Sequence, residues 1–286
     1  MDYQMGSHVL VNGANMYTVY YGNWTLSQQE IVNDFVSNLG GSSWYSYMSD
    51  YYYQADLNSE RRYVDRKLKL SKWVNDSYSL GETLQPTDYS DIISNLINDN
   101  VFPKDPKGIY AVLPSADVQC QFYINGTVET FGERYCGFHR FDNVPILFAK
   151  LTPAESNCSF KLNMIESPNG DVLVDNMLSH LAHEIVETVL SPEDNRAWID
   201  DKNLEPADIC NSDLGNVSAS SPHYNVEIGS RKYLIQNMYN LKKHQCMQGS
   251  LSFKAASSSY LPSQNHAPSL LKHLAFLFSL FSILLI

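Results

Sequence analysis

The chain has 286 residues, 44% hydrophobic and 18% charged, which is long enough to bury a substantial core in one domain. Its net charge of -11 argues against nucleic acid or an anionic membrane surface as the main partner. The sequence contains no Rossmann glycine pattern, P-loop or zinc-finger cysteine pairing, so the common nucleotide-binding and zinc-finger classes find no support.

The periodicity of apolar residues predicts an α+β fold. The expected strands are residues 8–21 with a turn at 12–13, 63–73, 108–113, 144–151 and parts of 224–239. The expected helices are residues 26–39, opened by a capping box of Thr25 and Gln28, and 88–100, capped by Thr87. The sequence therefore predicts a single domain over residues 1–249, with two or three helices packed on a mixed sheet, and a zincin-like arrangement is one form it could take.

A further helix, expected to follow a turn at residues 167–170 and to carry Asp171 and Asp175 in its first turn, holds most of the groups that could perform chemistry. Its apolar stripe consists of Met177, Leu178, Leu181, Ala182, Ile185, Val186 and Val189. His183 and Glu187 are four residues apart, so both side chains can reach one point beside the helix. Glu184 lies about 100° around the axis, still on the polar side. This is the spacing of an H-E-x-x-H zinc helix, with Glu187 in place of the second histidine.

One interpretation of these residues is a zinc centre. His183 and Glu187 would be ligands, and Glu184 would be the general base for a metal-bound water. The candidates for the third ligand are Glu205, Asp208 and His139. Calcium is the alternative ion, because the acidic residues offer several carboxylate oxygens, those of Glu187, Asp194, Glu205 and Asp208.

The competing interpretation is an ordinary amphipathic helix whose polar side faces solvent. His180 is expected on this wet side, because it lies only three residues before His183 and zinc-helix ligands are usually four apart. His139 would then be a loop histidine beside a disulfide at Cys136. Solvent-facing helices usually also carry Lys or Arg, and none occurs between Asp175 and Leu190, so the metal interpretation stays open.

The cysteines and the glycosylation sequons point to the secretory pathway. The widely spaced cysteines are typical of structural disulfides, with one thiol left over, and are Cys120, Cys136, Cys158, Cys210 and Cys246. A disulfide that closes residues 120–136 is one pairing considered. Sequons for N-linked glycans stand at Asn23, Asn75, Asn125, Asn157 and Asn216.

The end of the chain has the order of a GPI-attachment signal. A small-residue run at 255–259, with Ser257 as the expected attachment residue, precedes a spacer (within residues 250–269) and an apolar tail, 270–286. A retained C-terminal anchor is the alternative. Residues 1–4 show no signal peptide, and because GPI attachment requires entry into the secretory pathway, we expect such a signal to precede the residues given.

Several segments, in order over about residues 1–240, resemble the EXORDIUM / phosphate-induced protein family. They are Tyr20-Tyr21-Gly22-Asn23-Trp24, Leu113-Pro-Ser-Ala-Asp117-Val118, Tyr135-Cys136-Gly137-Phe138-His139 and Pro168-Asn-Gly-Asp171. Non-plant members resemble the chain more closely in the pattern His183-Glu184-x-x-Glu187, Pro192, Trp198, Asp200 and Glu205-x-x-Asp208-x-Cys210. The resemblance implies a secreted protein, found at the cell wall in plants and linked to growth responses. The family does not define a biochemical activity.

We therefore expect a secreted or cell-surface glycoprotein with one of two alternative functions. The first is a zinc-dependent, peptidase-like hydrolase that acts outside the cell. The second is a non-catalytic protein that binds cell-wall or matrix polysaccharide by stacking sugars on aromatic rings, with Trp44, Tyr51, Tyr52 and Tyr53 as candidates. In either case the expected partner is an extracellular matrix or cell-wall component.

Overall fold

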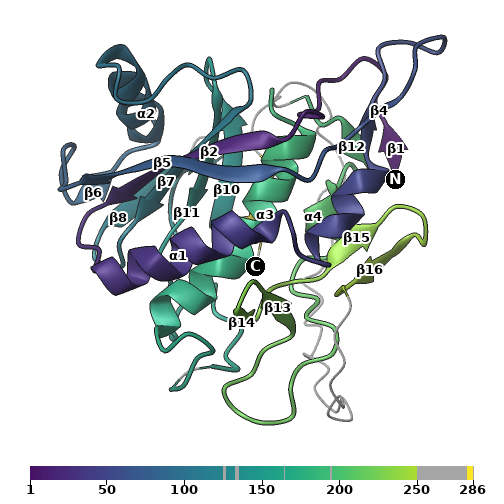
Figure 1. Cartoon of the computed structure of the whole chain (residues 1–286). Coiled ribbons are helices and arrows are strands. Elements are labelled where there is room, and N and C mark those ends of the chain that lie inside the picture. Colours follow the sequence, from purple (N-terminus) through teal and green to yellow (C-terminus); the bar gives the residue numbers. More distant parts are fainter. Residues whose placement is uncertain (125–126, 133–134, 164, 194, 250–281, 286) are drawn as a thin grey trace.

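The structure, a computed structural model, describes residues 1–124, 127–132, 135–163, 165–193, 195–249 and 282–285. A six-stranded sheet in the order β17-β10-β11-β7-β2-β5 forms its centre (Figure 1). Strands β5, β2, β7 and β11 are parallel to one another. Strand β10 is antiparallel to β11, and β17 is antiparallel to β10. The strands span Ala14–Tyr21 (β2), Leu68–Asp76 (β5), Gly108–Pro114 (β7), Tyr135–Phe141 (β10), Pro145–Ala149 (β11) and Ser282–Leu285 (β17).

Helices cover both faces of this sheet. Helices α1 (Leu26–Leu39) and α3 (Val172–Leu190) lie on one face, and α2 (Asp88–Asn98) lies on the other (Figure 1). Strand β7 shows the consequence, because Ala111 and Leu113 belong to the core under α1 and α3, while Tyr110 and Val112 belong to the core under α2. A strand buried on both faces is apolar throughout rather than alternating, as the sequence of β7 is.

The remaining elements are short and lie around this centre. The short strands are β1 (Asp2–Tyr3), β3 (Tyr52–Tyr53), β4 (Arg62–Tyr63), β6 (Thr83–Leu84), β8 (Gln119–Ile124), β9 (Thr127–Thr130), β12 (Trp198–Ile199), β13 (Val226–Ile228), β14 (Arg231–Tyr233), β15 (Met238–Asn240) and β16 (Gln245–Met247). The short helices are a 3-10 helix, η1 (Tyr45–Asp50), and α4 (Pro206–Ile209). The predicted α+β class, with three main helices on a mixed sheet, is confirmed.

The helix boundaries follow the local signals in most places. Thr25 caps α1 as predicted, since its hydroxyl accepts from the Gln28 amide and its own amide donates to the Gln28 side chain. Thr87 makes no such bond in the described structure. At that end the Asp88 carboxylate accepts from the Gln85 amide instead. A carboxylate in the first turn is also favoured by the positive end of the helix dipole.

Two sequence predictions about the first half of the chain are wrong. Residues 8–13 are not a strand, and β2 begins only at Ala14, where the chain enters the sheet between β5 and β7. Cys120 forms no disulfide among the described residues and is buried on β8. The disulfides are Cys136–Cys158 and Cys210–Cys246, so the considered closure of residues 120–136 does not occur.

Three further expectations depend on segments of which little is described. Ser257, Asn125 and Asp194 lie outside the described residues, as does most of the apolar tail. The described end of that tail, β17, pairs with the outer edge of β10. Among the described residues, none of the helices is both long and apolar enough to cross a membrane.

Candidate metal centre

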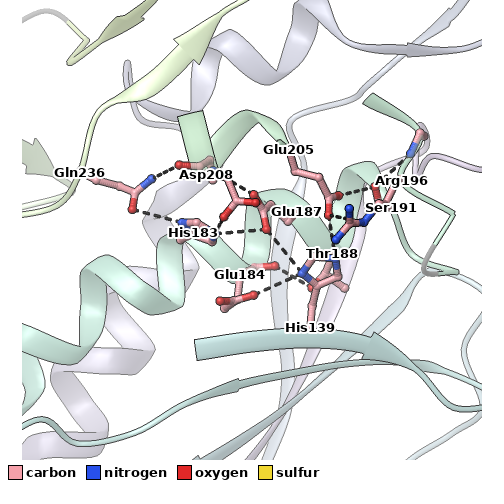
Figure 2. A network of polar contacts seen from close by, with 12 residues as sticks. His139, His183, Glu184, Glu187, Thr188, Ser191, Arg196, Glu205, Asp208 and Gln236 are labelled. Carbon is pink, nitrogen blue, oxygen red and sulfur yellow. Dashed lines mark hydrogen bonds and ion pairs between the residues drawn. The ribbon is translucent and has the colours of Figure 1, made fainter. Parts of the chain in front are cut away.

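Helix α3 has no wet side, because every residue from Val174 to Leu190 is buried. The sheet strands β10 and β11, helix α1 and helix α4 all pack against it. The competing interpretation, in which its polar arc faces solvent, is therefore excluded. That arc points instead toward β10 and α4, where other titratable side chains meet it (Figure 2).

Two histidines and four carboxylates converge at this place. His183 Nε2 lies 3.1 Å from Glu187 Oε2 and 3.5 Å from Asp208 Oδ1, which α4 supplies. His139, on β10, approaches three carboxylates of the same cluster. Its Nδ1 lies 3.3 Å from Glu184 Oε2 and 3.6 Å from Glu187 Oε2, and its Nε2 lies 3.8 Å from Glu205 Oε2. The six residues that the sequence suggested for a zinc centre are thus brought together, whereas Asp194, suggested only for calcium, lies outside the described residues.

The centre is sealed from solvent except at Asp208. The Asp208 side chain is 17% exposed, whereas the side chains of His139, His183, Glu184, Glu187 and Glu205 are at most 3% exposed. Two histidine–carboxylate sets each have ligand atoms within 4.8 Å of one another, His183–Glu187–Asp208 and His139–Glu187–Glu205. Both sets use the donor types that bind transition metals.

Three carboxylate oxygens in this cluster make no hydrogen bond to any described residue: Glu184 Oε1, Glu205 Oε2 and Glu187 Oε2, whose contact with His183 Nε2 at 3.1 Å is an ion pair without hydrogen-bond geometry. A buried polar atom left without a hydrogen bond is costly, and native proteins normally satisfy such atoms with protein, water or an ion. The orphaned oxygens therefore point to a group that the protein alone does not supply, and a cation fits the donors present.

The pKa values show how strongly the cluster depends on a compensating charge. Burial, reinforced by the other carboxylates, raises the pKa values of Glu184 and Glu205 well above normal and also raises that of Glu187. Burial lowers the pKa of His139 to about 3, and the charge of His183 adds to this effect. Without a cation, part of the cluster has to be neutralised by protons.

His183 and Asp208 are the exceptions, because they stabilise each other as an ion pair. Burial alone would lower the pKa of His183, but Glu187 and Asp208 outweigh it and hold that pKa well above normal. Burial would raise the pKa of Asp208, but the hydrogen bond and charge of His183 lower it overall.

Side chains that the sequence did not single out hold the ligands in place. The Gln236 side-chain oxygen lies 3.1 Å from His183 Nδ1, and its amide nitrogen donates to the Ala207 carbonyl in α4. Ser191 donates to Glu205 Oε1 at 2.7 Å. Such bonds to the second nitrogen or oxygen of a ligand fix its orientation. Common residues such as Ser and Gln carry no spacing signal, so sequence alone could not identify them.

Gly137 is a further residue whose role at the site the sequence did not reveal. A Cβ at this position would lie 2.6 Å from Glu184 Oε1, so only glycine lets β10 pass this close to the carboxylate. The glycine stands in the Cys136-Gly137 pair that was noted in the sequence, but its role becomes visible only when β10 is laid across α3.

His180 lies away from the centre. The sequence predicted it on a solvent-exposed face, and that prediction is wrong. Its ring is buried, and Nε2 donates to the Cys158 carbonyl at 2.7 Å. It lies near the sulfur atoms of Cys136 and Cys158. These sulfurs are joined in a disulfide and supply no thiolate, so this cluster is no thiolate metal site.

The fold and site together define an α+β domain built around a buried histidine–carboxylate cluster. The chain matches the family described as "Phosphate-induced protein 1 conserved region" over residues 1–249, and it belongs to that family. This confirms the resemblance seen in the sequence motifs.

The relatives are three plant proteins from Arabidopsis thaliana. Protein EXORDIUM-like 3 is 29% identical over 285 residues, covering 84% of this chain and 80% of the relative. Protein EXORDIUM-like 5 is 25% identical, covering 86% and 77% respectively. Protein EXORDIUM-like 1 is 23% identical, covering 86% and 88%. No solved structure matches the chain significantly.

Proposed function

We propose that this chain is a secreted or cell-surface glycoprotein with a zinc-dependent, peptidase-like hydrolase centre. The observation that carries the proposal is the convergence of His183, Glu187 and Asp208 beside a carboxylate oxygen with no hydrogen bond, Glu187 Oε2. One imidazole and two carboxylates are a ligand set that zinc accepts, with an open position for water. Zinc bound there would polarise a carbonyl group and lower the pKa of that water.

Glu184 is the residue proposed to move the proton. It follows His183 on α3, and its Oε1 makes no hydrogen bond to the described part of the chain. Because burial raises the pKa of its carboxyl group, Glu184 can hold a proton taken from water and deliver it to a leaving amine. Asp208, the least buried ligand at 17% exposed, marks the α4 side as the direction from which a substrate would approach.

Zinc is favoured over calcium by the two imidazoles. Calcium takes six to eight oxygen ligands and seldom histidine, whereas zinc binds nitrogen and oxygen together. His139 and His183 both turn ring nitrogens toward the carboxylates. Calcium would remain the better assignment only if the purified protein held it in preference to zinc.

The test combines metal analysis with a hydrolysis assay on a library of quenched peptides. The purified protein should hold zinc and cleave peptides, and His183→Ala should lose both. Glu184→Gln should keep zinc but lose cleavage, which separates the base from the ligands. His180→Ala is the matched control on the same helix, and it should keep both. Zinc-free protein that still cleaves peptides, or a fully active Glu184→Gln variant, would refute the proposal.

The proposed compartment outside the cell rests on two groups of observations. Two disulfides are typical of oxidising compartments. The sequon residues Asn23, Asn75, Asn157 and Asn216 are all exposed, as attachment of a glycan requires. We expect a mass decrease on enzymatic removal of N-glycans, and release of the protein from cells by a phosphatidylinositol-specific phospholipase if the GPI anchor at Ser257 is present.

A non-catalytic polysaccharide-binding function is the second candidate, with a smaller aromatic surface than the sequence suggested. Trp44 and Tyr51 are buried and donate to backbone carbonyls, so they cannot stack on sugars. The observation in favour is the pair of Tyr52 and Tyr63, whose rings lie 5.7 Å apart, with Tyr63 54% exposed. Binding to matrix glycans that survives His183→Ala but not Tyr63→Ala would support this function.

A further inference from the structure

Glu187 belongs to both histidine–carboxylate sets. One set pairs it with His183 and Asp208, and the other pairs it with His139 and Glu205. The two sets share no other residue. The second set draws its ligands from β10 and from the residue that precedes α4. The protein therefore presents two adjacent places for a cation, joined by one carboxylate.

The position of the Glu187 carboxylate suits a bridge. Its Oε1 accepts the backbone amide of Asp208 at 3.1 Å, which fixes the group. Its Oε2 has no hydrogen bond to any described residue and lies 3.1 Å from His183 Nε2 and 3.6 Å from His139 Nδ1. This oxygen thus lies close to His183 Nε2 and to the His139 ring. An ion binds only one nitrogen of an imidazole, and one ligand atom each of His139, Glu187 and Glu205 lie within 4.8 Å of one another. In two-metal sites, shared carboxylates typically hold cations about 3.5–4 Å apart.

Glu205 supplies an independent sign that the second place needs a ligand. Ser191 satisfies its Oε1, but its buried Oε2 makes no hydrogen bond within the described chain and faces His139 Nε2 at 3.8 Å. That separation is too long for a hydrogen bond. An ion coordinated by both groups would occupy the space between them and would satisfy both atoms.

The negative charge of the cluster also favours a second cation. The cluster holds four carboxylates, those of Glu184, Glu187, Glu205 and Asp208. The guanidinium of Arg196 lies 3.9 Å from Glu205, and its side chain is 44% exposed. With Arg196 beside Glu205, one divalent cation would leave one of the four carboxylate charges without a counter-charge, and a second cation would compensate it. Buried charges are retained only when they are compensated in this way.

We propose that the chain binds a second divalent cation on His139, Glu187 and Glu205, with Glu187 bridging it to the first. This inference rests on the proposed zinc centre and extends it to a two-metal centre. In peptide hydrolysis, a pair of cations would share the attacking water and the carbonyl oxygen of the substrate, while the leaving group, an amine, would take its proton from Glu184. His139 then is a ligand rather than the loop histidine that the sequence left as an alternative.

The test counts metal ions in the full glycosylated chain. Protein stripped with a chelator is titrated with cobalt(II), and the visible absorption and the bound metal per chain are measured. We expect saturation at two equivalents for the native chain, and at one equivalent for both His139→Ala and Glu205→Gln. The control is His180→Ala, which alters a buried histidine on α3 that belongs to neither set, and this variant should bind two equivalents.

Each possible outcome separates the two proposals. Native protein that saturates at one equivalent, with His139→Ala unchanged, overturns the second site and leaves the zinc centre standing. Native protein that binds no metal overturns both. Because the native chain alone decides the number of ions, a variant that fails to fold does not prevent the test. Circular dichroism identifies such a variant, and Glu205→Gln, which keeps the side-chain shape, guards against it.

Discussion

The two faces of strand β10 bury side chains of opposite character, aromatic rings on one face and charged groups on the other. On the α2 face, Phe138 stacks on Phe148 with ring centroids 5.1 Å apart and packs edge-on against Tyr89. On the α3 face the next residue, His139, enters a cluster of four carboxylates (Figure 2). Both neighbours are at most 3% exposed. The aromatic face is stable by packing alone, whereas the charged face requires compensation from a cation or from protons.

Removal of divalent metal should have the largest effect, and only on the charged face. Chelation should lower the free energy of unfolding by about 5 kcal/mol, because it leaves several buried carboxylates uncompensated. Thermal unfolding with and without chelator measures the loss, and added zinc should reverse it. Equal melting temperatures in both conditions would mean that the two faces do not differ in this respect.

Phe148→Ala tests the aromatic face in the same way. Phe148 is fully buried and contacts four other aromatic rings. Its truncation should destabilise the protein by about 4 kcal/mol. Denaturant unfolding measures this loss. The metal content should stay unchanged, because the deleted ring lies on the other face of the sheet. Loss of metal in a folded Phe148→Ala protein would show that the faces are not independent.

Gly137→Ala should disturb the charged face from the strand itself. The added methyl group would meet Glu184 Oε1 at 2.6 Å and Cγ at 3.0 Å, so the carboxylate has to move. We expect a destabilisation of about 2 kcal/mol and a larger fall in kcat than in metal content. The control is Gly41→Ala, where the new methyl lies at an ordinary 3.6 Å from the Asn38 carbonyl. Unchanged kcat in Gly137→Ala would contradict the role given to Glu184.

The smallest expected effect is a dependence of the free energy of unfolding on pH, which only the metal-free protein should show. Burial raises the pKa values of Glu184 and Glu205 above their unfolded values, and Glu187 and Asp208 raise that of His183 despite its burial. Groups with raised pKa values bind more protons when folded, so their contribution to stability falls as the pH rises.

The opposing groups set the pH window. Burial lowers the pKa values of His139 and His180, so their contribution increases only up to about their normal value of 6.5. Above that pH the metal-free protein should lose stability steadily, whereas the metal-loaded protein should not. Chemical denaturation from pH 7 to pH 9, with and without chelator, measures the difference. Parallel curves would argue that no cation replaces the protons.

The sequence identified the members of the cluster but not their surroundings. Local spacing placed His183, Glu184 and Glu187 together, because four residues complete about one helical turn. Burial of α3 on all sides depends on contacts with β10 and α4, which are distant in sequence and leave no local period. The same reason explains the wrong wet-face assignment of His180. The exposed aromatic surface was also overestimated, since hydrophobicity alone does not distinguish the buried Trp44 from the exposed Tyr63.

The fold was predicted best where signals are local. The capping box of Thr25 and Gln28 defined the start of α1, and the apolar run at residues 108–113 defined β7. Disulfide pairing could not be predicted, because it depends on which strands meet. Cys136 lies on β10 and is bonded to Cys158, which lies beyond β11 in the chain.

The most direct measurement is a crystal structure of the purified protein with diffraction recorded on both sides of the zinc absorption edge. We expect an anomalous peak among His183, Glu187 and Asp208 that vanishes below the edge, with ligand distances of about 2 Å. No anomalous peak in that cluster, with Glu184 and Glu205 protonated and bonded to ordered water, would contradict it.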